Sequence, residues 1–126
     1  IRLDPKQVQA CYNKGVALGH LGKHEQALAA FEEAIRLDPK NVRAWNNKGA
    51  ALGHLGRYEQ ALVAFEEAIR LNPKQVAAWS NKAIALDILG RHDEAIEAVD
   101  QALHISPNDG AAKYLKQLIE RETRPE

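Results

Sequence analysis

Residues 42–75 are VRAWNNKGAALGHLGRYEQALVAFEEAIRLNPKQ, and this stretch decides the fold. A shift of 34 places aligns it with residues 8–41 at 25 of 34 columns and with residues 76–109 at 14 columns. Four prolines mark the same period, at Pro5, Pro39, Pro73 and Pro107. A fixed period of this length is typical of repeat architectures, so we predict three full repeats.

Each repeat carries two apolar stripes with helical spacing. In the second repeat, Trp45, Gly49 and Leu52 share one helical face, and Ala61 and Phe65 share another. The stripes predict helical hairpins, with helices over 8–21, 24–37, 42–55, 58–71, 76–89 and 92–105. The predicted units are a remnant of a preceding repeat (1–7), three repeats (8–41, 42–75, 76–109), a closing helix (110–122) and a tail (123–126).

Glycine and proline separate the predicted helices. A glycine between the two helices of each hairpin should take positive φ, namely Gly22, Gly56 and Gly90. Asp38-Pro39 and its equivalents are expected to stop one helix and to cap the next with a side chain followed by proline. Gly15 and Gly49 fall inside a helix, where glycine costs about 1 kcal/mol relative to alanine, so close helix contact is expected there.

The ends and the surface charges carry further predictions. Residues 1–7 copy residues 35–41 almost letter for letter, so the array is expected to continue upstream. The apolar stripe of the closing helix does not follow the Trp column of the repeats, which predicts a rotated packing pose. Two Glu-to-Arg spacings of four residues, at Glu32–Arg36 and Glu66–Arg70, predict stabilising pairs on solvent-exposed faces.

Composition excludes several classes of protein. The 17 Lys and Arg residues balance 17 Asp and Glu residues, so the electrostatic footprint of a nucleic-acid binder is absent. No apolar run approaches the roughly 20 residues of a membrane span, and no signal peptide is visible at the N-terminus. We therefore expect no nucleic-acid or membrane partner and a cytoplasmic location.

The pattern of residues resembles the tetratricopeptide repeat family. The residues that carry the resemblance lie within one 34-residue helix-turn-helix, and they are Trp45, Gly49, Leu52, Gly56, Tyr58, Ala61, Phe65, Ala68 and Pro73. The resemblance implies an all-α, right-handed solenoid of three hairpins plus a C-terminal capping helix. It also implies a concave groove, lined by the first helices, that receives an extended peptide or a partner helix. Cys11 in the Trp column and Val99 in the Phe column depart from the family pattern.

The face of each first helix opposite its core stripe is the candidate binding surface. It lacks long Lys and Glu side chains and exposes Val16, Ile84 and Ile88. One of its columns is always Asn, which resembles the ladder of the O-linked N-acetylglucosamine transferase superhelix; an amide can pair with a peptide backbone because it is both donor and acceptor. This asparagine ladder consists of Asn13, Asn47 and Asn81. The candidate groove residues are Gln9, Tyr12, Asn13, Val16, His20, Arg43, Asn46, Asn47, Ala50, His54, Ala77, Asn81, Ile84, Asp87 and Ile88.

The dicarboxylate clamp of chaperone-tail-binding relatives is not matched. Its basic residue is replaced by Tyr12, Asn46 or Ser80. Its second Asn is replaced by Val16, Ala50 or Ile84. The resemblance therefore implies a peptide receptor that disfavours a free acidic C-terminus.

Alternatives to a peptide receptor remain at this stage. The asparagine ladder could cap polar groups between repeats, or could be a remnant of recent duplication. The whole chain could be a structural block, excised or engineered, whose ends stack on other copies. Catalysis has little support, because Cys11 lacks a base and forms no known metal-ligand spacing with His20 or His24. We expect no enzyme activity, no cofactor and no metal.

Overall fold

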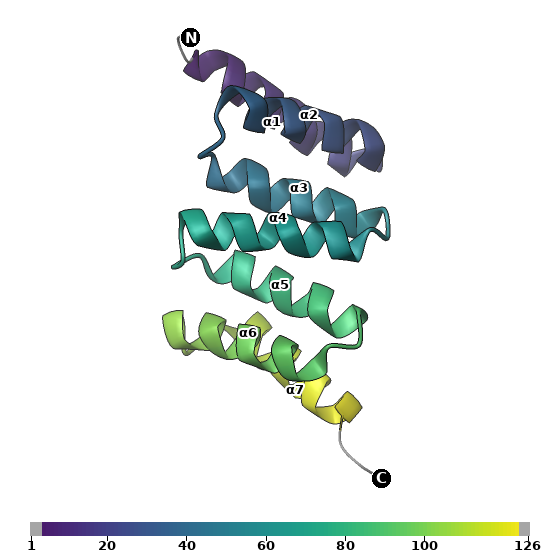
Figure 1. The fold of residues 1–126 in the computed structure, drawn as a ribbon, viewed down its shortest axis with the longest axis vertical. Helices are drawn as coiled ribbons and strands as arrows, with labels where there is room; N and C mark the ends of the chain where they lie inside the picture. The colour runs from purple at the N-terminus through teal and green to yellow at the C-terminus, as the bar shows by residue number, and fades with distance from the viewer. Residues whose placement is uncertain (1–3, 124–126) are drawn as a thin grey trace.

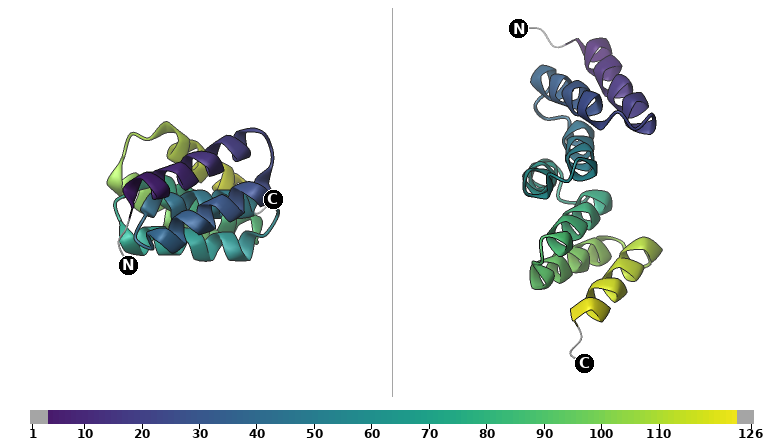
Figure 2. Two further views of the ribbon diagram at one scale, coloured as in Figure 1. Left: turned by 90° about the horizontal axis from the view of Figure 1, so that it is seen from above. Right: turned by 90° about the vertical axis from the view of Figure 1, so that its right-hand side faces the viewer.

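A computed structural model describes residues 4–123, and every regular element in that range is an α-helix. The helices are α1 (Pro5–His20), α2 (His24–Leu37), α3 (Val42–His54), α4 (Tyr58–Leu71), α5 (Val76–Ile88), α6 (His92–Ile105) and α7 (Gly110–Thr123). They stack in chain order (Figure 1), and the two ends of the chain lie at opposite ends of an elongated molecule (Figure 2). The predicted all-α repeat solenoid is confirmed. None of the helices in residues 4–123 is both long and apolar enough to cross a membrane.

Close packing inside each hairpin explains the glycines in the first helices. A Cβ atom built on Gly15 would lie 2.6 Å from Cε1 of Phe31, and one on Gly49 would collide with the ring of Phe65 in the same way. The predicted close contact is therefore confirmed. In the third repeat the equivalent residues are Ala83 and Val99, which belong to one core cluster and are fully buried. The larger residue on one helix is thus matched by a smaller one on the other.

The turn inside each hairpin is built as expected. Gly22, Gly56 and Gly90 have φ angles of 77°, 77° and 80°. In the first hairpin the N–H of Lys23 then donates to the carbonyl of Leu18 at 2.9 Å, which satisfies an acceptor at the end of α1. The glycines are needed because L residues with a side chain rarely adopt this backbone conformation.

The junctions between repeats differ from the prediction. The side chain of Asp4 accepts a backbone N–H at 3.0 Å and Pro5 follows it in the first turn, so α1 begins three residues before the expected start. Asp38 makes the same local contact but closes a turn, because α2 ends there and the chain must change direction. The cap of α3 is instead Asn41. Residues 5–7 thus belong to α1, and residues 1–3 lie outside the described residues.

The closing helix α7 keeps the register of the first helices, so the expected rotated pose is wrong. Its buried residues, Ala112 and Ile119, stand 34 places after the buried Ala78 and Ala85. One ion pair also recurs at the repeat period, with N–O distances of 3.4, 3.9 and 2.7 Å in Lys48–Glu32, Lys82–Glu66 and Lys116–Asp100. The helix therefore occupies the place of the first helix of a fourth repeat. Its apolar stripe differs from that of the first helices because the core columns of Ala83 and Leu86 carry Gln117 and Glu120 in α7.

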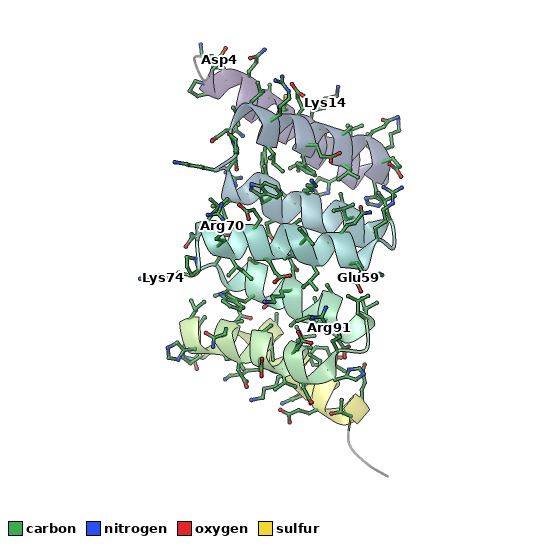
Figure 3. The ribbon with its side chains drawn as sticks, in the orientation of Figure 1. Asp4, Lys14, Glu59, Arg70, Lys74 and Arg91 are labelled. Carbon is green, nitrogen blue, oxygen red and sulfur yellow. The ribbon has the colours of Figure 1, made fainter. Side chains whose placement is uncertain are left out.

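Surface charges pair differently from the prediction. Arg36 and Arg70 bond Glu33 and Glu67, three residues away, while Glu32 and Glu66 pair with lysines of the next repeat. Charged side chains of both signs, including Lys14, Glu59 and Arg91, are spread along the whole stack (Figure 3).

The Trp column is half-buried in all three repeats. Its residues are Cys11, Trp45 and Trp79. Trp45 in the same column donates its Nε1–H to the carbonyl of Pro39 at 2.8 Å, and Lys48 lies over its ring. The apolar stem of Lys48 therefore runs along the indole surface, with its ammonium group over the ring.

Candidate functional site

Two cavities on the face of the first helices repeat with the period of the sequence. The first, of about 230 Å³, is lined by Gly15, Val16, Gly19, His20, His24, Ala27, Phe31, Asn47, Ala50, Ala51 and His54. The second, of about 280 Å³, is lined by Gly49, Ala50, Gly53, His54, Tyr58, Ala61, Phe65, Asn81, Ile84, Ala85 and Ile88. Every residue of the second stands 34 places after one of the first. The two cavities are therefore one site present in two copies.

Each cavity lies where one hairpin meets the first helix of the next. The glycine of the first helix, at Gly15 or Gly49, leaves the edge of a phenylalanine ring in the cavity wall. Ala50 and His54 line both cavities, so they form the ridge between them. A bulky side chain at Ala50 would consequently obstruct both.

The two cavities differ in chemistry. The first holds His20, His24 and His54, and the rings of the latter two stack with centroids 4.3 Å apart and an interplanar angle of 11°. In the second cavity the three equivalent positions carry His54, Tyr58 and Ile88, so only one of the three histidines is kept. Ile88 is 51% exposed, as expected for an apolar residue without a core role. The first cavity is therefore the more polar of the two, and the second is the more apolar.

The asparagine ladder links adjacent repeats. Nδ2 of Asn47 donates to the hydroxyl of Tyr12 at 2.8 Å, and Nδ2 of Asn81 donates to Oδ1 of Asn46 at 3.2 Å. Oδ1 of Asn13 accepts from a side chain of its own helix at 2.9 Å. The inter-repeat contact that the alternative interpretation expected is thus present at two rungs. Since each amide has two N–H donors and one acceptor oxygen, these two rungs retain hydrogen-bonding capacity toward the groove.

Tyr12 is held in place from three sides. Its hydroxyl accepts from Asn47, the guanidinium of Arg43 lies 4.6 Å from its ring centroid, and the ring of Phe31 lies 6.0 Å away. A side chain fixed in this way loses little conformational entropy when a ligand binds. Tyr12 and Arg43 together form a rigid edge beside the first cavity.

The structure gathers most but not all of the predicted groove residues into these features. The cavities contain Val16, His20, Asn47, Ala50, His54, Asn81, Ile84 and Ile88. The hydrogen-bonded edge contains Gln9, Tyr12, Asn13, Arg43 and Asn46. Ala77 is exposed outside both cavities, and Asp87 bonds His92 at the far end of α5.

Sequence analysis missed the cavity walls supplied by the second helices. His24, Ala27 and Phe31 line the first cavity, although only first-helix columns were considered. The signal was available, since the column shared by His24 and Tyr58 changes chemistry between repeats while the columns on either side keep their charge.

Comparison with known families decides the identity of the fold. Family models described as tetratricopeptide repeat match residues 8–41, 30–63 and 51–110. The chain belongs to the tetratricopeptide repeat family. Its three hairpins are therefore tetratricopeptide repeats, as the resemblance of the second repeat implied.

Solved tetratricopeptide domains share the whole architecture. The first TPR of Spaghetti (RPAP3), bound to the HSP90 peptide SRMEEVD, has a TM-score of 0.92 at 23% identity, and 97% of each chain is covered. The Arabidopsis OM64 TPR domain has a TM-score of 0.88 at 25% identity, covering 92% of this chain and 96% of that one. MamA has a TM-score of 0.87 at 25% identity, covering 94% and 70%. No curated protein sequence matches the chain.

Proposed function

We propose that this chain is a protein-interaction module that binds an extended segment of another protein along the groove face, without catalysing a reaction. The observation that carries the proposal is the pair of equivalent cavities. Two sites related by one repeat suit a ligand that runs along the stack and places one side chain in each. A compact metabolite would have no use for the second copy.

The chemistry of the cavities defines the partner. Ile84 and Ile88 are 42% and 51% exposed, so an apolar partner side chain would bury apolar surface in the second cavity. The imidazoles around His54 favour an aromatic or polar side chain in the first. Asn47 in the first cavity and Asn81 in the second each keep a free acceptor and a free donor that can bond the partner backbone, at about 0.5–1.5 kcal/mol for each hydrogen bond. The proposed partner therefore has two anchor residues separated by a short extended stretch.

The chaperone peptides seen with some structural neighbours do not suit this groove. Those neighbours include the first TPR of Spaghetti (RPAP3) with an HSP90 peptide and the TPR2AB domain of yeast Sti1 with HSP90. In this chain Tyr12 stands where the clamp family has its basic residue, and Val16 stands in place of the second clamp Asn. A terminal carboxylate would find no cation at those positions, so the proposed ligand is an internal segment.

Selection from a displayed library of extended peptides tests the proposal. Enriched peptides should share two anchor residues at a constant separation, one of them aliphatic. Ala50→Arg should abolish their binding, because Ala50 borders both cavities. Val63→Arg is the matched control, since Val63 is 65% exposed on α4 and lines neither cavity. Equal loss in both variants, with folding verified by circular dichroism, would exclude the groove as the binding site.

Self-stacking is the second candidate, and the structure of α7 weighs against it at one end. Where a further second helix would pack, α7 exposes Gln117 and Glu120. A polar outer face of this kind is what terminal units of repeat arrays use to remain soluble. Light scattering over a range of concentrations separates the proposals, since a stacking block must grow in mass. The expected cytoplasmic location can be checked by fractionation of the source cells.

A further inference from the structure

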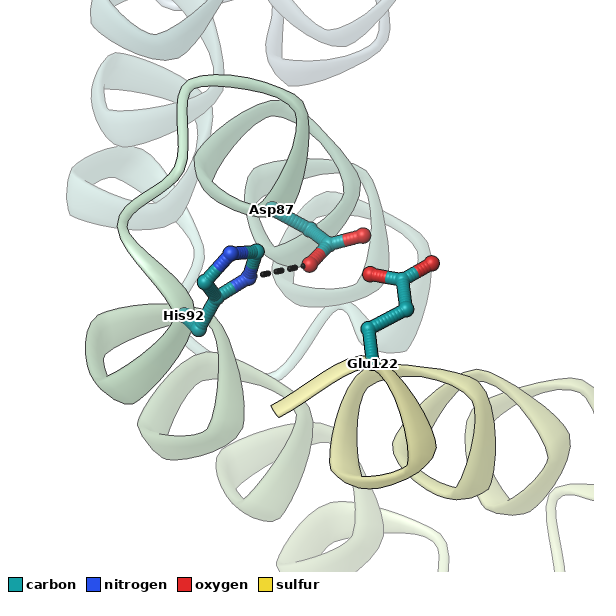
Figure 4. A group of neighbouring side chains, drawn as sticks. All are labelled: Asp87, His92 and Glu122. Atoms are coloured by element: carbon teal, nitrogen blue, oxygen red, sulfur yellow. Dashed lines mark hydrogen bonds and ion pairs between the residues drawn. The ribbon is translucent and has the colours of Figure 1, made fainter. Parts of the chain in front are cut away.

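We infer that Asp87, His92 and Glu122 form a binding site for a divalent transition metal ion that fastens α7 to the last repeat. The three residues come from the end of α5, the start of α6 and the end of α7 (Figure 4). One ligand atom from each lies within 4.8 Å of the others. Nδ1 of His92 lies 2.7 Å from Oδ1 of Asp87.

The trio occupies a position that exists three times in the solenoid. The equivalent residues are Gly19, His24 and His54 at the first junction and Gly53, Tyr58 and Ile88 at the second. Only at the third junction do all three positions carry a metal-ligating group. Repeat geometry thus brings these side chains together, because the corresponding His24 and His54 rings also touch.

The charge balance of the trio favours a cation. Two carboxylates face each other, and the described residues provide no Lys or Arg ion pair to either of them. The side chain of Asp87 is only 17% exposed, so water screens this repulsion incompletely. A divalent ion would balance both charges at once.

The ligand types select the class of ion. One imidazole nitrogen with two carboxylate oxygens suits Zn²⁺ and its first-row neighbours, whereas Mg²⁺ and Ca²⁺ prefer oxygen alone. Bonds of about 2.0–2.2 Å in tetrahedral geometry place ligand atoms roughly 3.3 Å apart. The ligand atoms of the trio lie within 4.8 Å of one another, so ion binding must draw them closer. Three protein ligands leave the fourth position to water.

Calorimetric titration of the full chain with Zn²⁺ alone tests the site. We expect one ion per chain and a higher melting temperature with Zn²⁺ than with Mg²⁺. His92→Tyr and Glu122→Gln should each weaken binding by about 10–100-fold or more. His92→Tyr is compatible with the fold, because Tyr58 fills the equivalent position. The matched controls His104→Tyr and Glu120→Gln alter exposed residues outside the trio and should bind as the parent does.

Three further outcomes would overturn the inference. If His24→Tyr removes Zn²⁺ binding and His92→Tyr does not, the ion binds at the stacked histidines of the first cavity. Equal responses to Mg²⁺ and Zn²⁺ would reduce the trio to a general acidic surface. Zn²⁺ should also slow amide hydrogen exchange in α7 selectively, and unchanged exchange in the metal-bound chain would refute its role as a fastener.

Discussion

The pairing of Gly49 with Phe65 gives the sharpest prediction for stability. In a helix interior, alanine is favoured over glycine by about 1 kcal/mol, so Gly49→Ala would be stabilising if the helix were isolated. In the folded chain the new Cβ would lie 2.6 Å from Cδ1 of Phe65 and 2.8 Å from Cζ. Ordinary carbon contacts are about 3.5–4.0 Å, so the ring must move by roughly 1 Å.

That movement has little room, because Phe65 is 4% exposed and belongs to the main core cluster. Overpacking of this kind costs about 1–3 kcal/mol, and the collision falls toward the upper end of that range. We therefore expect Gly49→Ala to lower the free energy of unfolding by about 2 kcal/mol, net of the helix-propensity gain. Phe65→Val alone should cost about 2–4 kcal/mol by leaving a cavity.

The double variant should recover part of both losses. It recreates the Ala83 and Val99 combination of the third repeat, where both residues are fully buried. A coupling free energy of about 1–2 kcal/mol is expected from urea denaturation followed by circular dichroism. Gly19→Ala is the control, since a Cβ there meets no heavy atom within 4 Å, and it should stabilise by about 0.5–1 kcal/mol. Additive single-variant effects, or a stabilising Gly49→Ala, would refute the packing argument.

Three smaller predictions concern the turns, the Trp column and the surface. Gly56→Ala should lower the free energy of unfolding by about 1–2 kcal/mol, because φ is 77° at this position. Urea denaturation measures this change, and a loss no larger than the experimental error would contradict the prediction. Trp45→Phe should cost about 1 kcal/mol through loss of the hydrogen bond to Pro39, measured the same way; a neutral result would mean that water replaces the bond. The hydrogen bond from Arg70 lowers the pKa of Glu67, so the pair contributes above the ordinary pKa of glutamate and loses its contribution as pH falls. Carboxyl titration by NMR should show the low pKa in the parent and an ordinary one in Arg70→Ala.

Local sequence was sufficient for the repeat architecture. The 34-residue period, the helical stripes and the turn glycines all act over short distances, so they predicted seven helices and three positive-φ glycines correctly. Local sequence did not determine the helix boundaries: Asp4 and Asp38 make the same local contact, yet one starts a helix and the other closes a turn. Which of these occurs depends on whether the chain is leaving a helix, and not on the aspartate itself.

The proposed binding surface was only partly predictable from the sequence. The columns of the first helices predicted Ile84, Ile88 and the asparagine ladder, because an exposed apolar residue opposite a core stripe is a local pattern. The contributions of His24 and Tyr58 were missed, since the second helix reaches the groove only through the angle at which hairpins stack.

What the sequence alone determined is the repeat: its period, its helices and the small residues that let helices approach. Those features follow from backbone propensity and side-chain size at fixed spacing. Only the tertiary structure decided which side chains come into contact across a junction between repeats. It joined Asp87 and His92 to Glu122, which lies 30 residues further along the chain, and it placed Ala112 and Ile119 in register with earlier repeats. The physical reason is that stacking brings residues at a constant sequence separation into direct contact. Which columns of neighbouring repeats come into contact depends on how the repeats stack, and a local sequence pattern does not contain that information.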